Sequence, residues 1–80
     1  MRPIFIQVKC ELGKAYDVAA HAVDTIEEVS EVYSTSGEYD LLIKCYLDPE
    51  SDIGRFVTAR IQTLPNVADT YTIMTFNAFT

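Results

Sequence analysis

The feature that most constrains the fold of this chain is an internal repeat with an offset of 35 residues. When the sequence is laid against itself at that offset without a gap, seven positions are identical: Lys9/Lys44, Cys10/Cys45, Leu12/Leu47, Asp17/Asp52, Ile26/Ile61, Val32/Val67 and Thr35/Thr70. A repeat of this length accommodates one supersecondary unit. Local patterns indicate a strand, a helix and a second strand in each half. We therefore expect two similar β-α-β units.

The first half is defined by two periodicities. Apolar residues alternate from Ile4 to Leu12, which predicts the first strand. From residue 14 to 27 they recur at helical spacing, which predicts the first helix. Its expected buried face is Ala15, Val18, Ala19, Ala22, Val23 and Ile26. The stretches 29–35 and 39–47, joined through Ser36 and Gly37, then predict a β-hairpin.

The second helix has start and stop signals. Asp48 is the expected N-cap and Pro49 the first helical residue. The expected buried face is Ile53, Phe56, Val57, Ile61 and Leu64. Pro65 and Asn66 should end the helix, because proline disfavours helical geometry in the residue before it. The last strand is predicted over residues 67–76.

This order, βαββαβ, predicts an α+β fold of the ferredoxin-like type, in which two helices cover one face of a four-stranded antiparallel sheet. Alternation places these residues on the other, open face: Phe5, Gln7, Lys9, Leu42, Lys44, Tyr46 and, if the last strand follows the register of Val67, Thr70, Thr72, Met74 and Phe76. So much apolar surface is unusual on a small monomer. We expect a second chain to cover this face, contacting Phe5, Leu42, Tyr46 and Phe76.

Length and composition narrow the class of protein. Eighty residues predict one domain, 1–80, near the lower limit for a self-sufficient core. The sequence lacks a long apolar run and a signal-like N-terminus, which predicts a cytoplasmic domain. The net charge of −6 opposes direct binding to nucleic acid. Cys10 and Cys45 lie in apolar strands, so we expect buried free thiols, with a disulfide as the less favoured alternative.

The turn of the predicted hairpin carries residues that a turn does not require. Gly37 supplies the positive φ of a tight turn. Tyr39 and Asp40 follow it, although aspartate is depleted in strands. Tyr39 could be a core or interface aromatic, and Asp40 could protect a sheet edge or pair with Lys44. The alternative is that these residues serve a function.

Two segments resemble a known family. Residues 35–44, TSGEYDLLIK, and 64–70, LPNVADT, are similar to motifs of the C-terminal effector-binding domain of the Lrp/AsnC (feast/famine) regulators. The resemblance covers essentially the whole chain, with Asn66 at a position where the family usually has glycine. Family members place a helix-turn-helix domain before this region, whereas this sequence begins at Met1. We therefore expect a stand-alone effector domain, with a fragment cut at that boundary as the alternative.

The resemblance implies how such a domain works. Two domains would join through their sheets, and dimers would form a ring-like octamer or decamer with amino-acid effectors between them, without direct contact to nucleic acid. The implied effector site comprises Ser34, Gly37, Glu38, Tyr39, Asp40, Ile73, Met74 and Thr75. Asp40 would accept from the ammonium group, and backbone N–H groups beside Gly37 would donate to the carboxylate. The partner would be a second copy or a full-length regulator.

Other functions find less support in the sequence. An enzyme would need acid–base or nucleophilic residues, but His21 stands alone on the first helix, and Glu27, Glu28 and Glu31 are expected to be solvated. A metal chaperone would need cysteines at 11–16, and an RNA-binding module would need basic charge. We expect that the domain is not an enzyme and that it binds neither a metal nor a cofactor. A general amino-acid-sensing module, binding near Gly13 in the loop after the first strand, is the main competing hypothesis.

Overall fold

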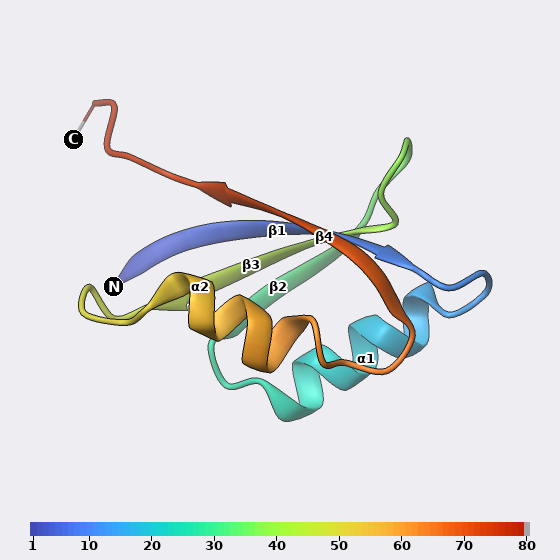
Figure 1. The fold of residues 1–80 in the computed structure, drawn as a ribbon. Helices are drawn as coiled ribbons and strands as arrows, with labels where there is room; N and C mark the ends of the chain where they lie inside the picture. Colours follow the sequence, from blue (N-terminus) through green and yellow to red (C-terminus); the bar gives the residue numbers. More distant parts are fainter. Residues whose placement is uncertain (80) are drawn as a thin grey trace.

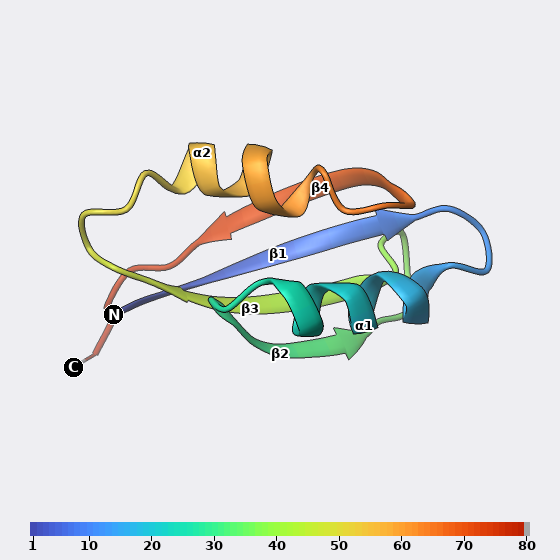
Figure 2. The same ribbon diagram turned by 90° about the horizontal axis from the view of Figure 1, so that it is seen from below.

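The structure, a computed structural model, describes residues 1–79 and contains four strands and two helical segments in the predicted order. The strands pair in the order β2-β3-β1-β4 with every neighbour antiparallel. Both helices lie on one side of the sheet (Figures 1 and 2). This confirms the predicted ferredoxin-like fold. The elements are β1 Arg2–Cys10, α1 Ala15–Thr25, β2 Val29–Ser34, β3 Leu41–Leu47, α2 Ile53–Phe56, a π-helical continuation η1 Val57–Ile61, and β4 Val67–Met74.

The core lies between the helices and the two central strands. Alternate residues of β1 and β3 are buried, and both free cysteines are among them, as predicted. The prediction for Val23 was wrong, because its side chain is 59% exposed and α1 buries only a narrow stripe centred on Val18 and Ala22. The buried set is Ile4, Ile6, Val8, Cys10, Val18, Ala22, Ile26, Leu41, Ile43, Cys45, Leu47, Phe56, Val57, Ile61 and Leu64.

The second helix begins later than its start signals predicted. Asp48 is not the N-cap, because its carbonyl accepts from the backbone N–H of Ser51 at 3.0 Å in a separate turn. Asp52 caps the helix instead, and its side chain accepts from the backbone N–H of Arg55 at 3.1 Å. The helix widens into π geometry after Phe56, and Asn66 turns the chain into β4 with a φ of 69°. Asn66 thus takes the left-handed geometry that asparagine tolerates.

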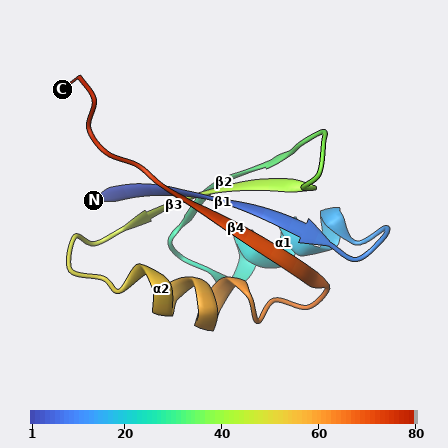
Figure 3. The same cartoon turned by 45° about the horizontal axis from the view of Figure 1, so that its top comes forward.

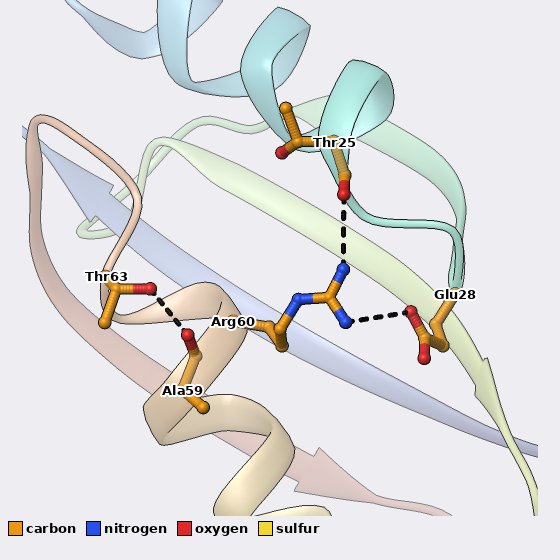
Figure 4. A network of polar contacts seen from close by, with 5 residues as sticks. All are labelled: Thr25, Glu28, Ala59, Arg60 and Thr63. Atoms are coloured by element: carbon orange, nitrogen blue, oxygen red, sulfur yellow. Dashed lines mark hydrogen bonds and ion pairs between the residues drawn. The ribbon is translucent and has the colours of Figure 1, made fainter.

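One arginine ties the two helical segments together (Figure 4). Arg60 Nη2 on η1 donates to the carbonyl of Thr25, the last residue of α1, at 3.2 Å. Its Nη1 lies 3.9 Å from Glu28 Oε1. The last turn of α1 has no basic residue, so Arg60 brings a positive charge to the negative end of that helix dipole. Glu28 was expected to be solvated, and it instead pairs with this arginine.

The register of β4 overturns part of the predicted open face. Cys10 pairs with Val67 and Lys9 with Asp69, so a bulge inserts one extra residue into β4. That insertion reverses which residues point to each face. Thr70, Thr72 and Met74 pair with the buried residues Val8, Ile6 and Ile4, so they lie on the helix side, and the predicted placement was wrong. The open face carries instead Asp69, Tyr71 and Ile73.

Candidate functional site

The turn between β2 and β3 is a closed loop with a defined shape. Gly37 has a φ of 99°, which favours glycine. The backbone N–H of Thr35 donates to the carbonyl of Asp40 at 2.9 Å, and the Thr35 hydroxyl donates to the carbonyl of Tyr39 at 3.0 Å. Tyr39 and Asp40 therefore belong to the turn, and β3 begins at Leu41 rather than at Tyr39 as predicted. In Figures 1 and 3 the turn rises from the sheet on the side away from the helices.

Asp40 joins this turn to β1. Its backbone N–H donates to the carbonyl of Val8 at 2.9 Å, and its Oδ2 accepts from the backbone N–H of Cys10 at 2.8 Å. Burial, and then the negative charge of Asp40, raise the pKa of the Cys10 thiol. The alternative pairing of Asp40 with Lys44 does not occur, because Lys44 pairs with Glu31. One oxygen of the predicted ammonium acceptor is thus engaged by the backbone.

Two tyrosines and two acids gather beside the turn. The rings of Tyr39 and Tyr71 are 6.3 Å apart between centres. Burial raises the pKa of the Tyr39 hydroxyl, and the nearby charges of Asp69 and Glu38 raise it further. Aromatic rings beside carboxylates suit a positively charged group. Tyr71 and Asp69 were not among the predicted site residues, because the bulge in β4 brings them to this face.

The other predicted site residues lie farther along the chain, at the end of β4 and just beyond it. Ile73 is opposite Phe5 on the open face, whereas Met74 is opposite Ile4 on the helix side. The Thr75 hydroxyl donates to the carbonyl of Pro3 at 2.6 Å. Since the turn meets β1 at Val8, Thr75 beside Pro3 lies about 17 Å from it along the strand, and Ile73 opposite Phe5 lies about 10 Å from it. Within a single chain, Ile73 follows Tyr71 on the same face, whereas Met74 and Thr75 do not reach the turn. Ser34 and Gly37 remain with the turn.

The loop after β1, which the competing hypothesis favours, adjoins the turn. Gly13 has a φ of 78° and, with Tyr16 and Asp40, lines a hollow of about 270 Å³. Leu12, predicted to end the first strand, is 98% exposed in this loop. Asp40 therefore faces both candidate sites, and a substitution of Asp40 alone does not distinguish them.

The centre of the open face is a charged cluster set among aromatic rings. Lys44 Nζ lies 3.6 Å from Glu31 Oε1, 5.9 Å from the ring centre of Phe5 and 5.1 Å from that of Tyr46. Glu31 also accepts from the Tyr33 hydroxyl. That hydrogen bond, and then the charge of Lys44, lower the pKa of Glu31. Glu31 was expected to be solvated, and its pairing with Lys44 depends on a register shift between Val29 and Glu31 on β2.

Phe76, predicted to contact a second chain, lies beyond β4. The guanidinium carbon of Arg2 stands 5.7 Å from its ring centre. Phe5, Leu42 and Tyr46 do lie on the open face, where each is half-buried. Their contact with a second chain stays a prediction.

The structure also bears on the residues considered for catalysis and metal binding. His21 is exposed on α1. Among residues 1–79 there is no group of three or more His, Cys, Asp or Glu side chains placed to hold a metal ion. Within the same residues, no helix is long and apolar enough to cross a membrane.

Comparison with known proteins decides the family. A family model described as "Lrp/AsnC ligand binding domain" matches residues 4–80. The chain belongs to this family. This Lrp/AsnC domain is 34% identical over 70 residues to the HTH-type transcriptional regulator FL11 of Pyrococcus abyssi, covering 88% of the chain and 45% of that regulator. The chain thus spans about half the length of this curated relative.

Solved structures share the fold of this Lrp/AsnC domain. The crystal structure of FFRP-DM1 is 32% identical, with a TM-score of 0.86, and the match covers 95% of this chain and all of that one. The transcriptional regulator NMB0573 of Neisseria meningitidis, solved as a complex with L-Met, is 20% identical with a TM-score of 0.81, covering 99% of this chain and 52% of that one. The second likeness shows the fold alone.

Proposed function

We propose that this Lrp/AsnC domain binds an α-amino acid and assembles through its open face, and that it modulates transcription in the cytoplasm through a ring of eight or ten copies or through a full-length regulator. The observation that carries the proposal is the separation of its predicted site into two halves. The turn with Glu38, Tyr39 and Asp40 lies at one end of the sheet, whereas Met74 is on the helix side and Thr75 lies about 17 Å away along the strand. A second copy would bring Met74 and Thr75 to the turn.

The chemistry of the turn half suits an amino acid. Glu38 and Asp69, beside the rings of Tyr39 and Tyr71, would accept the ammonium group. Backbone N–H groups beside Gly37 would donate to the carboxylate. Ile73 and Met74 of a second copy would then contact the side chain of the ligand. The L-Met complex of NMB0573 supports an amino acid as the ligand class.

Binding would act on assembly only through a difference in affinity. A ligand held between two copies binds the assembled form better than the separate chains, and it therefore shifts the population toward assembly. A partner regulator of the same family would be recruited in the same way. This gives the domain a regulatory role without a chemical reaction.

A general amino-acid-sensing module is the second candidate. The hollow beside Gly13, lined in part by Asp40, favours it. In that case the ligand would lie in the loop after β1 of a single chain. Assembly would not then be required for binding.

A thermal-shift screen against the twenty amino acids at millimolar concentration tests the proposal. A ligand present at 100 times its dissociation constant stabilises the native state by about 2.7 kcal/mol. We expect a rise in Tm with one amino acid or a few related ones, and none with the D-enantiomer of the best ligand. No rise with any of the twenty would contradict the proposed function.

Two glycines provide a matched pair that separates the candidates. Gly37→Ala and Gly13→Ala both place a side chain at a positive φ, and in both cases the added Cβ meets nothing within 4 Å. Each should therefore cost a similar backbone strain, on the order of 1 kcal/mol. We expect Gly37→Ala to weaken ligand binding and Gly13→Ala to leave it unchanged. The reverse result would favour the sensing module.

A further inference from the structure

We propose that Asp40 is a positioning residue, which holds the β2–β3 turn against the end of β1 and acts on the ligand through the turn rather than by touching it. This rests on the proposed function above. It departs from the role implied by the family resemblance, in which the carboxylate of Asp40 accepts from the ammonium group.

The backbone of β1 explains why an acceptor is needed here. Val8 and Cys10, two residues apart, direct their backbone groups to the same side of the strand, toward β3. Val8 is satisfied there by the backbone N–H of Asp40 at 2.9 Å. The ladder with β3 then ends, because the chain leaves it for the turn. The side chain of Asp40 takes the place of the missing carbonyl and accepts from Cys10 N–H at 2.8 Å.

Leaving that N–H without a partner would be unfavourable. Cys10 is 7% exposed, and a buried backbone donor without an acceptor destabilises the structure. The bulge between Lys9 and Cys10 shifts the pairing with β4 at the same place. Asp40 therefore supplies the acceptor for the Cys10 N–H, a backbone group that pairing with β3 leaves without a partner.

The same residue also holds the turn. Its carbonyl accepts from the Thr35 N–H at 2.9 Å, and the neighbouring carbonyl of Tyr39 accepts from the Thr35 hydroxyl at 3.0 Å. Three groups of Asp40 thus connect β1 on one side with the start of the turn on the other. Tyr39 is held between these anchors, with its ring toward Tyr71. Release of Asp40 would free Tyr39 and Glu38, which the proposed site uses.

A pair of substitutions separates positioning from contact. Asp40→Asn keeps a side-chain oxygen for Cys10 N–H but removes the charge that an ammonium group would need. Asp40→Ala removes both. If the turn of the alanine variant holds its binding conformation about one tenth of the time, the apparent dissociation constant rises about tenfold. Asp17→Ala serves as the control, because it changes the net charge of the chain by the same amount at an exposed position on α1.

Two measurements are made on the full chain: the dissociation constant for L-methionine, or for the amino acid with the largest thermal shift, by calorimetry, and the exchange rate of the Cys10 amide by NMR. We expect Asp40→Ala to raise both about tenfold or more. Asp40→Asn and Asp17→Ala should leave both within about threefold. This pattern would support the positioning role.

Two results would overturn it. Asp40→Asn could weaken binding as much as Asp40→Ala while the Cys10 amide stays protected, which would mean that the charge contacts the ligand. Alternatively, the Cys10 amide could exchange at the same rate in Asp40→Ala as in the native chain, which would mean that Asp40 holds nothing. If no amino acid binds the native chain, the proposed function fails, and the exchange measurement still decides whether Asp40 holds the turn.

Discussion

At the scale of single residues, the buried thiol of Cys45 makes the stability of the fold depend on pH. Its side chain has no exposed surface, and burial, followed by the charge of Glu28, raises the thiol pKa from 9.0 to about 12. The folded state therefore keeps a proton that the unfolded state releases above pH 9. We expect the free energy of unfolding to fall from pH 9 to 12, measured by urea denaturation, and to fall less steeply in Cys45→Ala. Equal slopes in the two proteins would contradict this.

The type of a residue predicted its local backbone geometry, but it did not predict which distant residue it contacts. Gly37 and Asn66 have the positive φ that their types favour in turns. The partner of Asp40 was not predictable, since Cys10 lies 30 residues away. The bulge in β4 at the same level likewise leaves no clear mark in the alternation of apolar residues. The sequence indicated that Asp40 was unusual but not which atom it holds.

At the scale of elements, periodicity predicted which segments are helices and which are strands. It did not predict where α2 begins or which residues of β4 lie on each face of the sheet. Asp48 and Asp52 are both acceptable caps, and only the turn closed by Ser51 decides between them. On β4, one inserted residue exchanged the two faces, so Met74 and Tyr71 changed places relative to the prediction. The faces of Ile73 and Met74, two of the eight predicted site residues, depended on that register.

Substitution of Arg60 tests whether its contacts between η1 and the end of α1 stabilise the fold. Arg60→Ala removes the hydrogen bond to the carbonyl of Thr25 and leaves Glu28 Oε1, a buried atom, without its ion pair. We expect a loss of about 1 kcal/mol in the free energy of unfolding, measured by urea denaturation. Arg55→Ala, on the same helical stretch, is the control, because the Arg55 side chain is 90% exposed. Its loss should be below about 0.5 kcal/mol, and equal losses would refute a bridging role.

At the scale of the whole molecule, the two faces of the sheet differ in what covers them. The helices bury one face, and the other presents Phe5, Leu42 and Tyr46 around the pair formed by Lys44 and Glu31. Pairing within the chain, together with the aromatic contacts of Lys44, lowers the cost of covering these charges with a second copy. Apolar contacts beside them would supply the driving force for association.

Association through this face is tested by Phe5→Glu. The new carboxylate would lie near Lys44 Nζ, now 5.9 Å from the Phe5 ring centre, so a separate folded chain should tolerate it. In an assembly it would bury an additional charge, which is strongly unfavourable. By analytical ultracentrifugation at micromolar concentration, we expect the native chain to be at least dimeric and Phe5→Glu to be a folded monomer. Tyr16→Glu, at a 75% exposed position on α1, should leave the assembly intact. A monomeric native chain, or dissociation caused equally by Tyr16→Glu, would rule out assembly through the open face.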